Sequence, residues 1–167
     1  MLKVGDKIVY GANGVMTIID IREESFGGAC RSYYVLAPMH SKSESQVFVP
    51  TDSERLVSMM RPLVTKEEIF EMFSGSAILP EVRWIEANRA RQEHFKKILE
   101  SGDRREILAV IRAIDESAKQ REMQGKKNFL ADENIKLRAT NILYSEISVV
   151  LGIPEDEVGE FIQNLTM

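Results

Sequence analysis

Hydrophobic and polar residues follow two different patterns along this 167-residue chain, and the pattern changes near Pro62. Before Pro62, short runs rich in Val, Ile, Tyr and Phe alternate with clusters of turn-forming residues, which is typical of β-strands. After Pro62, apolar residues recur at a spacing of about 3.6, which is typical of helices. The sequence therefore predicts an α+β protein of two domains, residues 1–62 and 63–167.

The first domain is predicted to contain four or five short antiparallel strands. Four of them are Asp6–Tyr10, Val15–Glu24, Arg31–Ala37 and Ser45–Pro50. Turn formers separate the strands, with Gly11-Ala-Asn-Gly14 after the first, Gly27-Gly28 after the second and the polar loop Pro38–Ser43 after the third. We expect no helix here. A sheet this small protects its edges by curling, so we predict an antiparallel β-barrel of the Tudor or SH3-like type, which can leave one edge free for a partner.

The second domain is predicted to be an all-α bundle of four or five helices. Thr65 is expected to cap a short helix that ends near Phe73, because its hydroxyl can accept bonds from the amides of the first turn. Pro80 is tolerated as a first helical residue, so we expect a long polar helix from Pro80 to about Glu100, ended by Ser101-Gly102.

Three more helices are expected after Gly102. Asp103 and Glu106 form a cap for the first of them, whose apolar stripe reaches Ala118. The second runs from about Ile135 to Val150 and ends at Gly152, and the third begins at Pro154.

Composition restricts the class of protein. The chain has 44% hydrophobic and 29% charged residues, as expected for a globular protein. Its apolar runs are far shorter than the roughly 20 residues that cross a bilayer, and its first residues do not resemble a signal sequence. Cys30 is the only cysteine, which excludes an intramolecular disulfide. We therefore expect a cytoplasmic protein without a membrane partner.

The net charge of −4 conceals an asymmetry. Residues 80–127 carry 12 Lys and Arg against 9 Asp and Glu, whereas residues 128–167 are strongly acidic. Only the 80–127 segment can face phosphate, and its excess is modest, so a solvated helix face explains it equally well. Strong DNA binding by the isolated protein is not expected.

The sequence contains no recognisable catalytic or metal-binding motif. His40 and His94 have no Asp, Glu or Cys at metal-ligand spacing. Gly11-Ala-Asn-Gly14 lacks the Gly-Lys-Ser/Thr that follows a phosphate-binding loop, and Cys30 has no identifiable histidine partner. We therefore expect no enzymatic activity, metal, cofactor or small-molecule substrate.

Trp84, the only tryptophan, lies in a polar part of the predicted helix 80–100. Asn88 and Arg91 follow at i+4 and i+7, which places an aromatic ring, an amide and a cation on one helix face. Two interpretations stay open. Trp84 packs against the preceding helix or the β-domain, or it acts as a wedge in a nucleic-acid groove beside phosphate-binding arginines. The candidate DNA-binding residues are Trp84, Arg83, Asn88, Arg89 and Arg91.

Several residues in order along the chain resemble the CarD/CdnL family of RNA polymerase-binding transcription regulators. They are Val4-Gly-Asp-x-Ile-Val-Tyr10, Gly14, Tyr33-Tyr34, Val47-x-Val-Pro50 and, in the helical half, a tryptophan and Ser101-Gly-Asp103. The resemblance implies a Tudor-like domain, shared with the transcription-repair coupling factor, that pairs an edge strand with the β subunit of bacterial RNA polymerase. The candidate contacts are Tyr34, Val47, Phe48 and Val49.

The resemblance also implies a helical domain that meets promoter DNA at the upstream edge of the bubble, where the family's tryptophan stabilises the open complex. Trp84 is the candidate here. Three features depart from the family pattern. Gly11-Ala-Asn-Gly14 replaces Pro-x-His-Gly, Phe48 stands where relatives can have a basic residue, and Trp84 lies about one helical turn further from Gly102, so that Asn88 is nearest the usual position.

Three functions are compatible with these observations. The first is a transcription regulator that binds polymerase and DNA, and the second is an adaptor whose two domains bind only proteins. The third is an enzyme of unknown chemistry, which the missing motifs disfavour.

Overall fold

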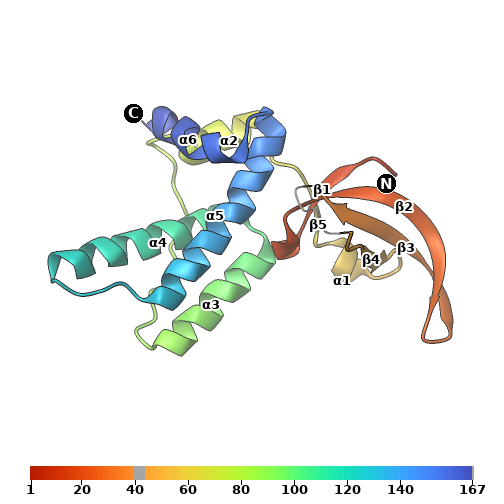
Figure 1. Cartoon of the computed structure of the whole chain (residues 1–167), viewed down its shortest axis with the longest axis horizontal. Coiled ribbons are helices and arrows are strands. Elements are labelled where there is room, and N and C mark those ends of the chain that lie inside the picture. The colour runs from red at the N-terminus through yellow and green to blue at the C-terminus, as the bar shows by residue number, and fades with distance from the viewer. Residues whose placement is uncertain (40–43, 167) are drawn as a thin grey trace. The chain divides into compact units, whose positions relative to one another are not determined.

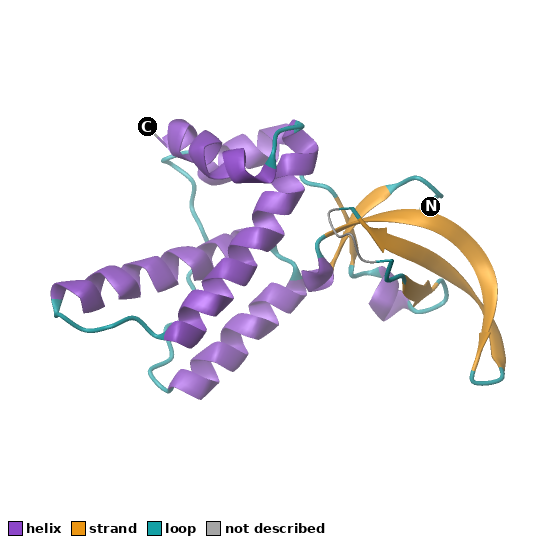
Figure 2. Ribbon diagram, viewed as in Figure 1, coloured by secondary structure: helices purple, strands orange, loops and turns teal. Residues whose placement is uncertain are grey.

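The computed structural model describes residues 1–39 and 44–166, and the chain divides into two compact units, Met1–Leu63 and Val64–Met167 (Figure 1). Strands occur in the first unit and long helices in the second, as Figure 2 shows. No helix in the described ranges has the length and hydrophobicity needed to cross a membrane. His40 and most of the predicted Pro38–Ser43 loop lie outside the described residues.

The first unit is a five-stranded antiparallel sheet with the order β4-β3-β2-β1-β5. Its strands are β1 (Lys7–Tyr10), β2 (Val15–Phe26), β3 (Ala29–Pro38), β4 (Val47–Pro50) and β5 (Met60–Pro62). The four predicted strands are confirmed, and the hairpin of β2 and β3 extends further than predicted, to the turn at Gly27-Gly28. β4 and β5 are the two edges, and no pairing joins them among the described residues, so the predicted barrel closure is not seen.

One hydrophobic cluster of this unit lies on one face of the sheet. Its buried residues are Ile8, Tyr10, Met16, Ile18, Leu36, Val49 and Met60. Side chains alternate between the faces of a strand, and Val9 and Val35, which are also buried, lie on the other face. A bulge between Ile18 and Asp20 interrupts the pairing of β2 with β3, and bulges of this kind increase the local twist of a sheet.

The expectation that the first unit has no helix is wrong. A one-turn helix, α1 (Glu54–Val57), lies between β4 and β5. Ser53 caps it, since the amide of Leu56 donates to the Ser53 hydroxyl at 3.4 Å. A segment this short has no detectable apolar period, and the cap is its only sequence signal.

The second unit is helical, as predicted. Its helices are α2 (Lys66–Phe73), α3 (Asn88–Ser101), α4 (Arg104–Met123), α5 (Leu130–Leu151) and α6 (Val158–Thr166), with a 3-10 turn at Glu155–Glu157. The predicted helix boundaries at Thr65, Asp103, Gly102 and Gly152 are confirmed; both glycines adopt the left-handed conformation that ends a helix. The central helix is α5, because it packs against α2, α3, α4 and α6.

The prediction of a helix from Pro80 is wrong. α3 begins only at Asn88, and residues 74–87 form an extended connection without a helix. In a continuous helix the carbonyls of Ile85 and Glu86 would accept from amides four residues later. In the structure both carbonyls accept instead from the side chain of Arg91. This side chain therefore stabilises the non-helical path of the segment that carries Trp84.

Candidate functional site

Arg91 lies inside the helical unit and not on its surface. The residue is 1% exposed, and its guanidinium forms an ion pair with Asp132 at the start of α5. Arg91 Nη2 and Nε donate to Asp132 Oδ2 at 2.7 and 3.1 Å. A buried charge requires a partner and hydrogen bonds to offset its desolvation, and Asp132 supplies both. Arg91, predicted from its sequence position to face DNA, is therefore engaged within the domain.

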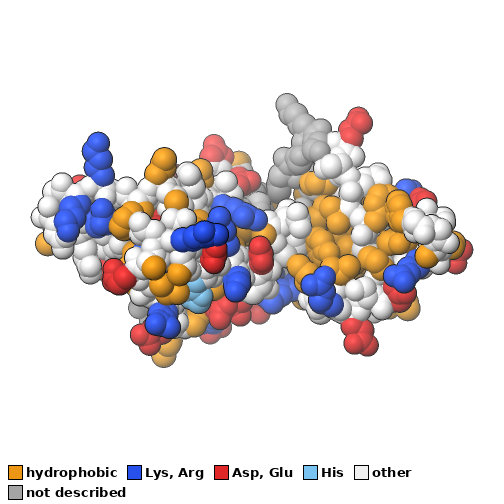
Figure 3. All heavy atoms as spheres, turned by 90° about the horizontal axis from the view of Figure 1, so that it is seen from below, with side chains coloured by type: hydrophobic (Ala, Val, Ile, Leu, Met, Phe, Trp, Pro, Cys, Tyr) orange, Lys and Arg blue, Asp and Glu red, His pale blue; other side chains and the backbone are white. Residues whose placement is uncertain are grey.

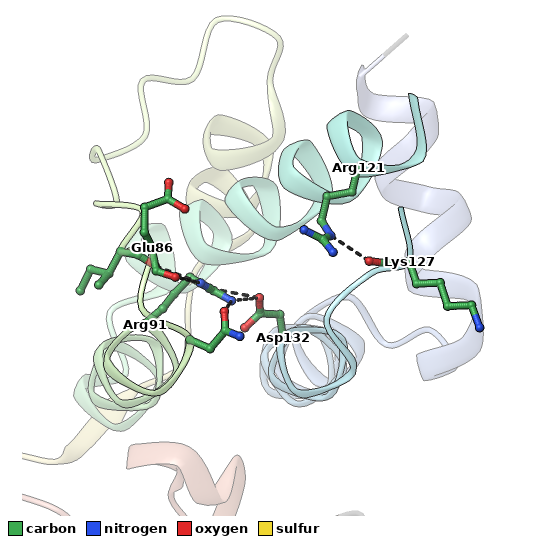
Figure 4. Close-up of polar contacts among 7 residues, drawn as sticks. Glu86, Arg91, Arg121, Lys127 and Asp132 are labelled. Carbon is green, nitrogen blue, oxygen red and sulfur yellow. Dashed lines mark hydrogen bonds and ion pairs between the residues drawn. The ribbon is translucent and has the colours of Figure 1, made fainter. Parts of the chain in front are cut away.

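The remaining donors of Arg91 hold the connection before α3. Nη1 donates to the carbonyls of Ile85 and Glu86 at 2.9 and 3.2 Å, and Nη2 donates to Asn88 Oδ1 at 3.0 Å. Figure 4 shows the guanidinium between these acceptors and Asp132. One side chain thus joins the connection, the first turn of α3 and the first turn of α5.

Aromatic rings complete the surroundings of the guanidinium. Arg91 Cζ lies 4.5 Å from the ring centroid of Trp84 and 4.8 Å from that of Phe129. Arg121 also lies over Phe129, at 3.9 Å, and is held there by a hydrogen bond to the carbonyl of Lys127 (Figure 4). These distances fit cation–π attraction.

Trp84 is partly buried within its own unit. Its ring contacts Phe95 with centroids 5.9 Å apart, in addition to Arg91. The prediction that Trp84, Asn88 and Arg91 share one helix face is wrong, because α3 begins only at Asn88. Trp84 and Asn88 each contact the folded-back side chain of Arg91. Among the predicted DNA-binding residues, Arg83, Asn88 and Arg89 are exposed. Arg89 makes a surface ion pair with Glu93, which contributes little to stability.

A groove of about 430 Å³ opens beside Trp84, between the connection and α4. Its lining includes two acidic residues, Glu86 and Glu116, together with Arg121 and Phe129. A small neighbouring cavity shares Trp84, Arg121 and Phe129 with this groove and is also lined by Asp132, whose buried Oδ1 has no hydrogen-bond partner among the described atoms. Sequence reasoning missed Phe129 and Asp132, since they follow Arg91 by about forty positions and no local spacing marks them.

The second candidate surface is the outer edge of β4, which pairs only with β3 among the described strands. The amide of Thr51 donates to the carbonyl of Ser32 at 3.0 Å. This bond shows which residues of β4 turn their amide and carbonyl toward β3 and which turn them outward. Because hydrogen-bonded pairs alternate in antiparallel strands, the amide and carbonyl of Phe48 point away from β3. Pro50 has no amide hydrogen, and its carbonyl accepts from Ser53. Phe48 is thus the residue of β4 whose main chain faces outward.

The predicted polymerase-binding side chains divide between the two sheet faces. Val49 is 0% exposed in the core, and Tyr34 and Val47 pack against that core, so the Val49 side chain is out of reach of a partner. Phe48 lies on the opposite face with Phe26 and Tyr33. The ring centroids of these three residues are 5.2 to 6.2 Å apart with edge-to-face geometry.

We call Phe26, Tyr33 and Phe48 the aromatic cluster. Arg22 lies over the Phe48 ring at 5.5 Å, and Phe26 is 51% exposed. Figure 3 shows hydrophobic side chains gathered on one face of the β-unit. Phe26 and Arg22 were not predicted, although strand register alone places Arg22 opposite Tyr33 on this face.

Comparison with protein families identifies a domain in the first unit. Residues 2–64 match the family model of the CarD-like/TRCF RID domain, which covers all five strands and the free edge of β4. No curated protein sequence matches the chain.

Proposed function

Because residues 2–64 of this chain belong to the CarD-like/TRCF RID domain family, we propose that the protein is a non-enzymatic, cytoplasmic transcription regulator. It docks on the β subunit of bacterial RNA polymerase and stabilises the promoter open complex through its helical unit. The family match is the observation that carries the proposal, and it supports an RNA polymerase-interacting, transcription-associated protein.

The geometry of β4 supports the mode of docking. An edge strand recognises an extended segment by main-chain hydrogen bonds, with specificity supplied by the neighbouring side chains. In β4 the outward amide and carbonyl belong to Phe48, and the aromatic cluster lies directly beside them. An apolar contact at Phe48 takes the place of the ionic contact that a basic residue would make at this position.

In the helical unit, Arg83, Asn88 and Arg89 are exposed and lie within five positions of the partly buried Trp84 along the chain. A domain tethered to polymerase needs little intrinsic DNA affinity, because tethering raises its effective concentration at the promoter. Contacts that form only with opened DNA shift the population toward the open complex, whereas equal contacts with closed DNA shift nothing. The modest positive charge of this region is sufficient under such an arrangement.

Docking is tested by gel filtration of the full chain with bacterial RNA polymerase at low salt. The wild-type protein is expected to co-migrate, and Phe48→Ser is expected to weaken co-migration. Ile78→Ser is the matched control, since Ile78 is 88% exposed in the other unit and should behave as wild type. Failure of the wild-type chain to co-migrate overturns the proposal.

The DNA role is tested by the lifetime of the open complex with Trp84→Ala. We expect a shorter lifetime with unchanged co-migration, and partial recovery with Trp84→Phe, which keeps an aromatic face. An unchanged lifetime in Trp84→Ala eliminates the wedge and leaves only polymerase docking.

One observation favours a second candidate, the protein-only adaptor. Trp84 packs on Phe95 and Arg91, and Arg91 is buried, so this side of α3 is partly closed to DNA. Trp84 fluorescence separates the candidates. Acrylamide quenching of Trp84 is measured in the polymerase complex with and without promoter DNA. If DNA leaves the quenching unchanged, the adaptor is supported; if DNA protects Trp84 from quenching, the regulator is supported.

A further inference from the structure

Trp84 lies in the extended connection before α3, outside any helix, so helical hydrogen bonds of its own segment do not fix its orientation. From the contacts around it we infer that Arg91 is a positioning residue. Paired with Asp132, Arg91 holds Trp84 in the orientation that acts on promoter DNA. The inference rests on the proposed function, because it assigns what holds the tryptophan of the same site in place.

Local signals do not fix the boundary between the connection and α3. Ala87 stands at the N-cap without a side-chain hydrogen bond, and the first turn of α3 contains no acidic residue. Alanine is among the weakest N-cap residues, and an acid in the first turn is what the helix dipole favours. The carbonyls of Ile85 and Glu86, directly after Trp84, accept instead from Arg91 Nη1 at 2.9 and 3.2 Å. Arg91 therefore restrains the backbone on which Trp84 stands.

Arg91 also restrains the ring of Trp84. Its Cζ lies 4.5 Å from the ring centroid, within the range of cation–π attraction. The attraction is stronger when the cation is removed from water, and Arg91 is 1% exposed. Phe95 packs on the same ring with centroids 5.9 Å apart. The backbone and the side chain of this segment are thus held by the same guanidinium.

Asp132 determines where that guanidinium points. It lies in the first turn of α5 and accepts from Arg91 Nε and Nη2 at 3.1 and 2.7 Å. Because the guanidinium is planar and its donors form a rigid fork, an acceptor on one side directs the remaining Nη1 to the other. Figure 4 shows Arg91 between Asp132 and the connection. The function of Arg91 therefore depends on its shape as well as its charge, and lysine cannot replace it.

Holding Trp84 in advance has a measurable consequence. A side chain that is free before binding loses its rotamer freedom in the complex, and this loss weakens binding about two- to tenfold for one side chain. A side chain that is already held avoids most of this loss. Substitution of Arg91 should therefore shorten the open-complex lifetime by about this factor, although the buried Arg91 has no access to DNA itself.

The first test is the lifetime of the open complex with Arg91→Lys in the full chain. We expect a lifetime about two- to tenfold shorter than wild type, with unchanged co-migration with polymerase. Asp132→Asn should act in the same direction. The matched control is Glu146→Gln, which changes the other buried carboxylate of α5, whose partners are Arg104 and the Val64 amide, and should keep the wild-type lifetime. Urea denaturation of each variant establishes that it is folded under the assay conditions.

A double variant separates positioning from a general structural role. If Arg91 acts through Trp84, then Arg91→Lys with Trp84→Ala has the lifetime of Trp84→Ala alone, within the error of about twofold that such a comparison carries. A lifetime shortened beyond that error would assign Arg91 a role independent of Trp84 and overturn the inference.

The fluorescence of Trp84, the only tryptophan, reports its position without DNA or polymerase. Arg91→Lys should increase acrylamide quenching and lower the fluorescence anisotropy, whereas Glu146→Gln should change neither. Unchanged fluorescence in Arg91→Lys overturns the inference. If Trp84→Ala shortens the lifetime and Arg91→Lys does not, the inference fails alone. If Trp84→Ala leaves the lifetime unchanged while Arg91→Lys increases quenching, the DNA role of the proposed function fails, and Arg91 still holds the ring.

Discussion

Two regions of the helical unit each contain a buried carboxylate paired with an arginine, and the two pairs are built differently. Asp132 and Arg91 are 3% and 1% exposed in their side chains, whereas Glu146 is 2% exposed and Arg104 is 21% exposed. Glu146 uses both oxygens, because Arg104 Nε lies within 2.9 Å of each. Asp132 uses only Oδ2, and Oδ1 has no partner among the described atoms.

The groups joined by the two pairs also differ. Glu146 of the Arg104–Glu146 pair also accepts a hydrogen bond from the amide of Val64 at 2.7 Å, and this bond fixes the first residue of the unit to α5. The Arg91–Asp132 pair reaches the carbonyls of Ile85 and Glu86 in a connection that has no helical hydrogen bonds. The same chemistry thus anchors regular structure in one region and holds an irregular segment beside Trp84 in the other. We expect the second pair to be the more costly to break.

The largest effect is expected from Asp132→Ala. This change leaves Arg91 buried without a counter-charge, which costs about 3–5 kcal/mol of unfolding free energy. Urea denaturation measures it. Asp132→Asn keeps one acceptor and the side-chain shape, so it should retain more stability than Ala. A loss below about 1 kcal/mol for Asp132→Ala would show that Arg91 finds another partner or water.

Glu146→Gln should cost less, about 1–3 kcal/mol. The amide oxygen can still accept from Val64, and Arg104 is exposed enough to recover water. Limited proteolysis distinguishes the two ion pairs by the site of cleavage. Asp132→Asn should increase cleavage within residues 74–87, and Glu146→Gln should not. Equal cleavage in both variants would contradict the distinction between the two regions.

Thr65→Ala tests the helix cap that lies next to the Arg104–Glu146 pair in the chain. Thr65 follows Val64 and caps α2, accepting from the amide of Glu68 at 3.1 Å while its own amide donates to the Glu68 carboxylate at 2.8 Å. Loss of the hydroxyl should cost about 1 kcal/mol in urea denaturation. Thr65→Ser keeps the acceptor and serves as the control. If both variants lose the same stability, packing of the methyl group explains the effect.

The smallest effect is a pH dependence at Glu68. The hydrogen bonds from the Thr65 amide and hydroxyl lower the pKa of the Glu68 carboxyl below its ordinary value of 4.5, with smaller contributions from Arg104 and Arg105. Ionised Glu68 therefore stabilises the fold above that value, and the contribution is lost as pH falls through the lowered pKa. The stability difference between wild type and Glu68→Gln should shrink from neutral pH to about pH 3. A constant difference would contradict the assignment.

The parts of the fold that the sequence predicts correctly depend on local signals. Alternating apolar residues identify β1 to β4, and the caps at Thr65 and Asp103 and the glycines at 102 and 152 mark helix ends. The path of residues 80–87 was not predictable in this way. Pro80 satisfies the rule for a helix start, but the carbonyls of Ile85 and Glu86 accept from Arg91, which pairs with Asp132, 41 positions later.

The candidate site was predicted in part for the same reason. The i+7 relation between Trp84 and Arg91 predicts a shared helix face, which is wrong because Trp84 precedes α3. The two residues meet because the Arg91 side chain folds back toward the connection. Their burial depends on Phe95, Phe129 and Asp132, which come from other parts of α3 and from the start of α5. The DNA-contacting and polymerase-contacting roles of the individual residues stay predictions.

The edge of β4 has a consequence for the kinetics of a complex. With four residues, a proline at its end and one outward-facing residue, Phe48, it can form only a single pair of main-chain hydrogen bonds with a partner strand. So short a ladder cannot propagate from molecule to molecule, which protects the exposed edge from aggregation. It also places most of the binding free energy in side-chain contacts, and affinity differences at such surfaces appear mainly in the dissociation rate. Under the proposed function, substitutions in the aromatic cluster would therefore set how long the regulator stays on polymerase, with little influence on how fast it arrives.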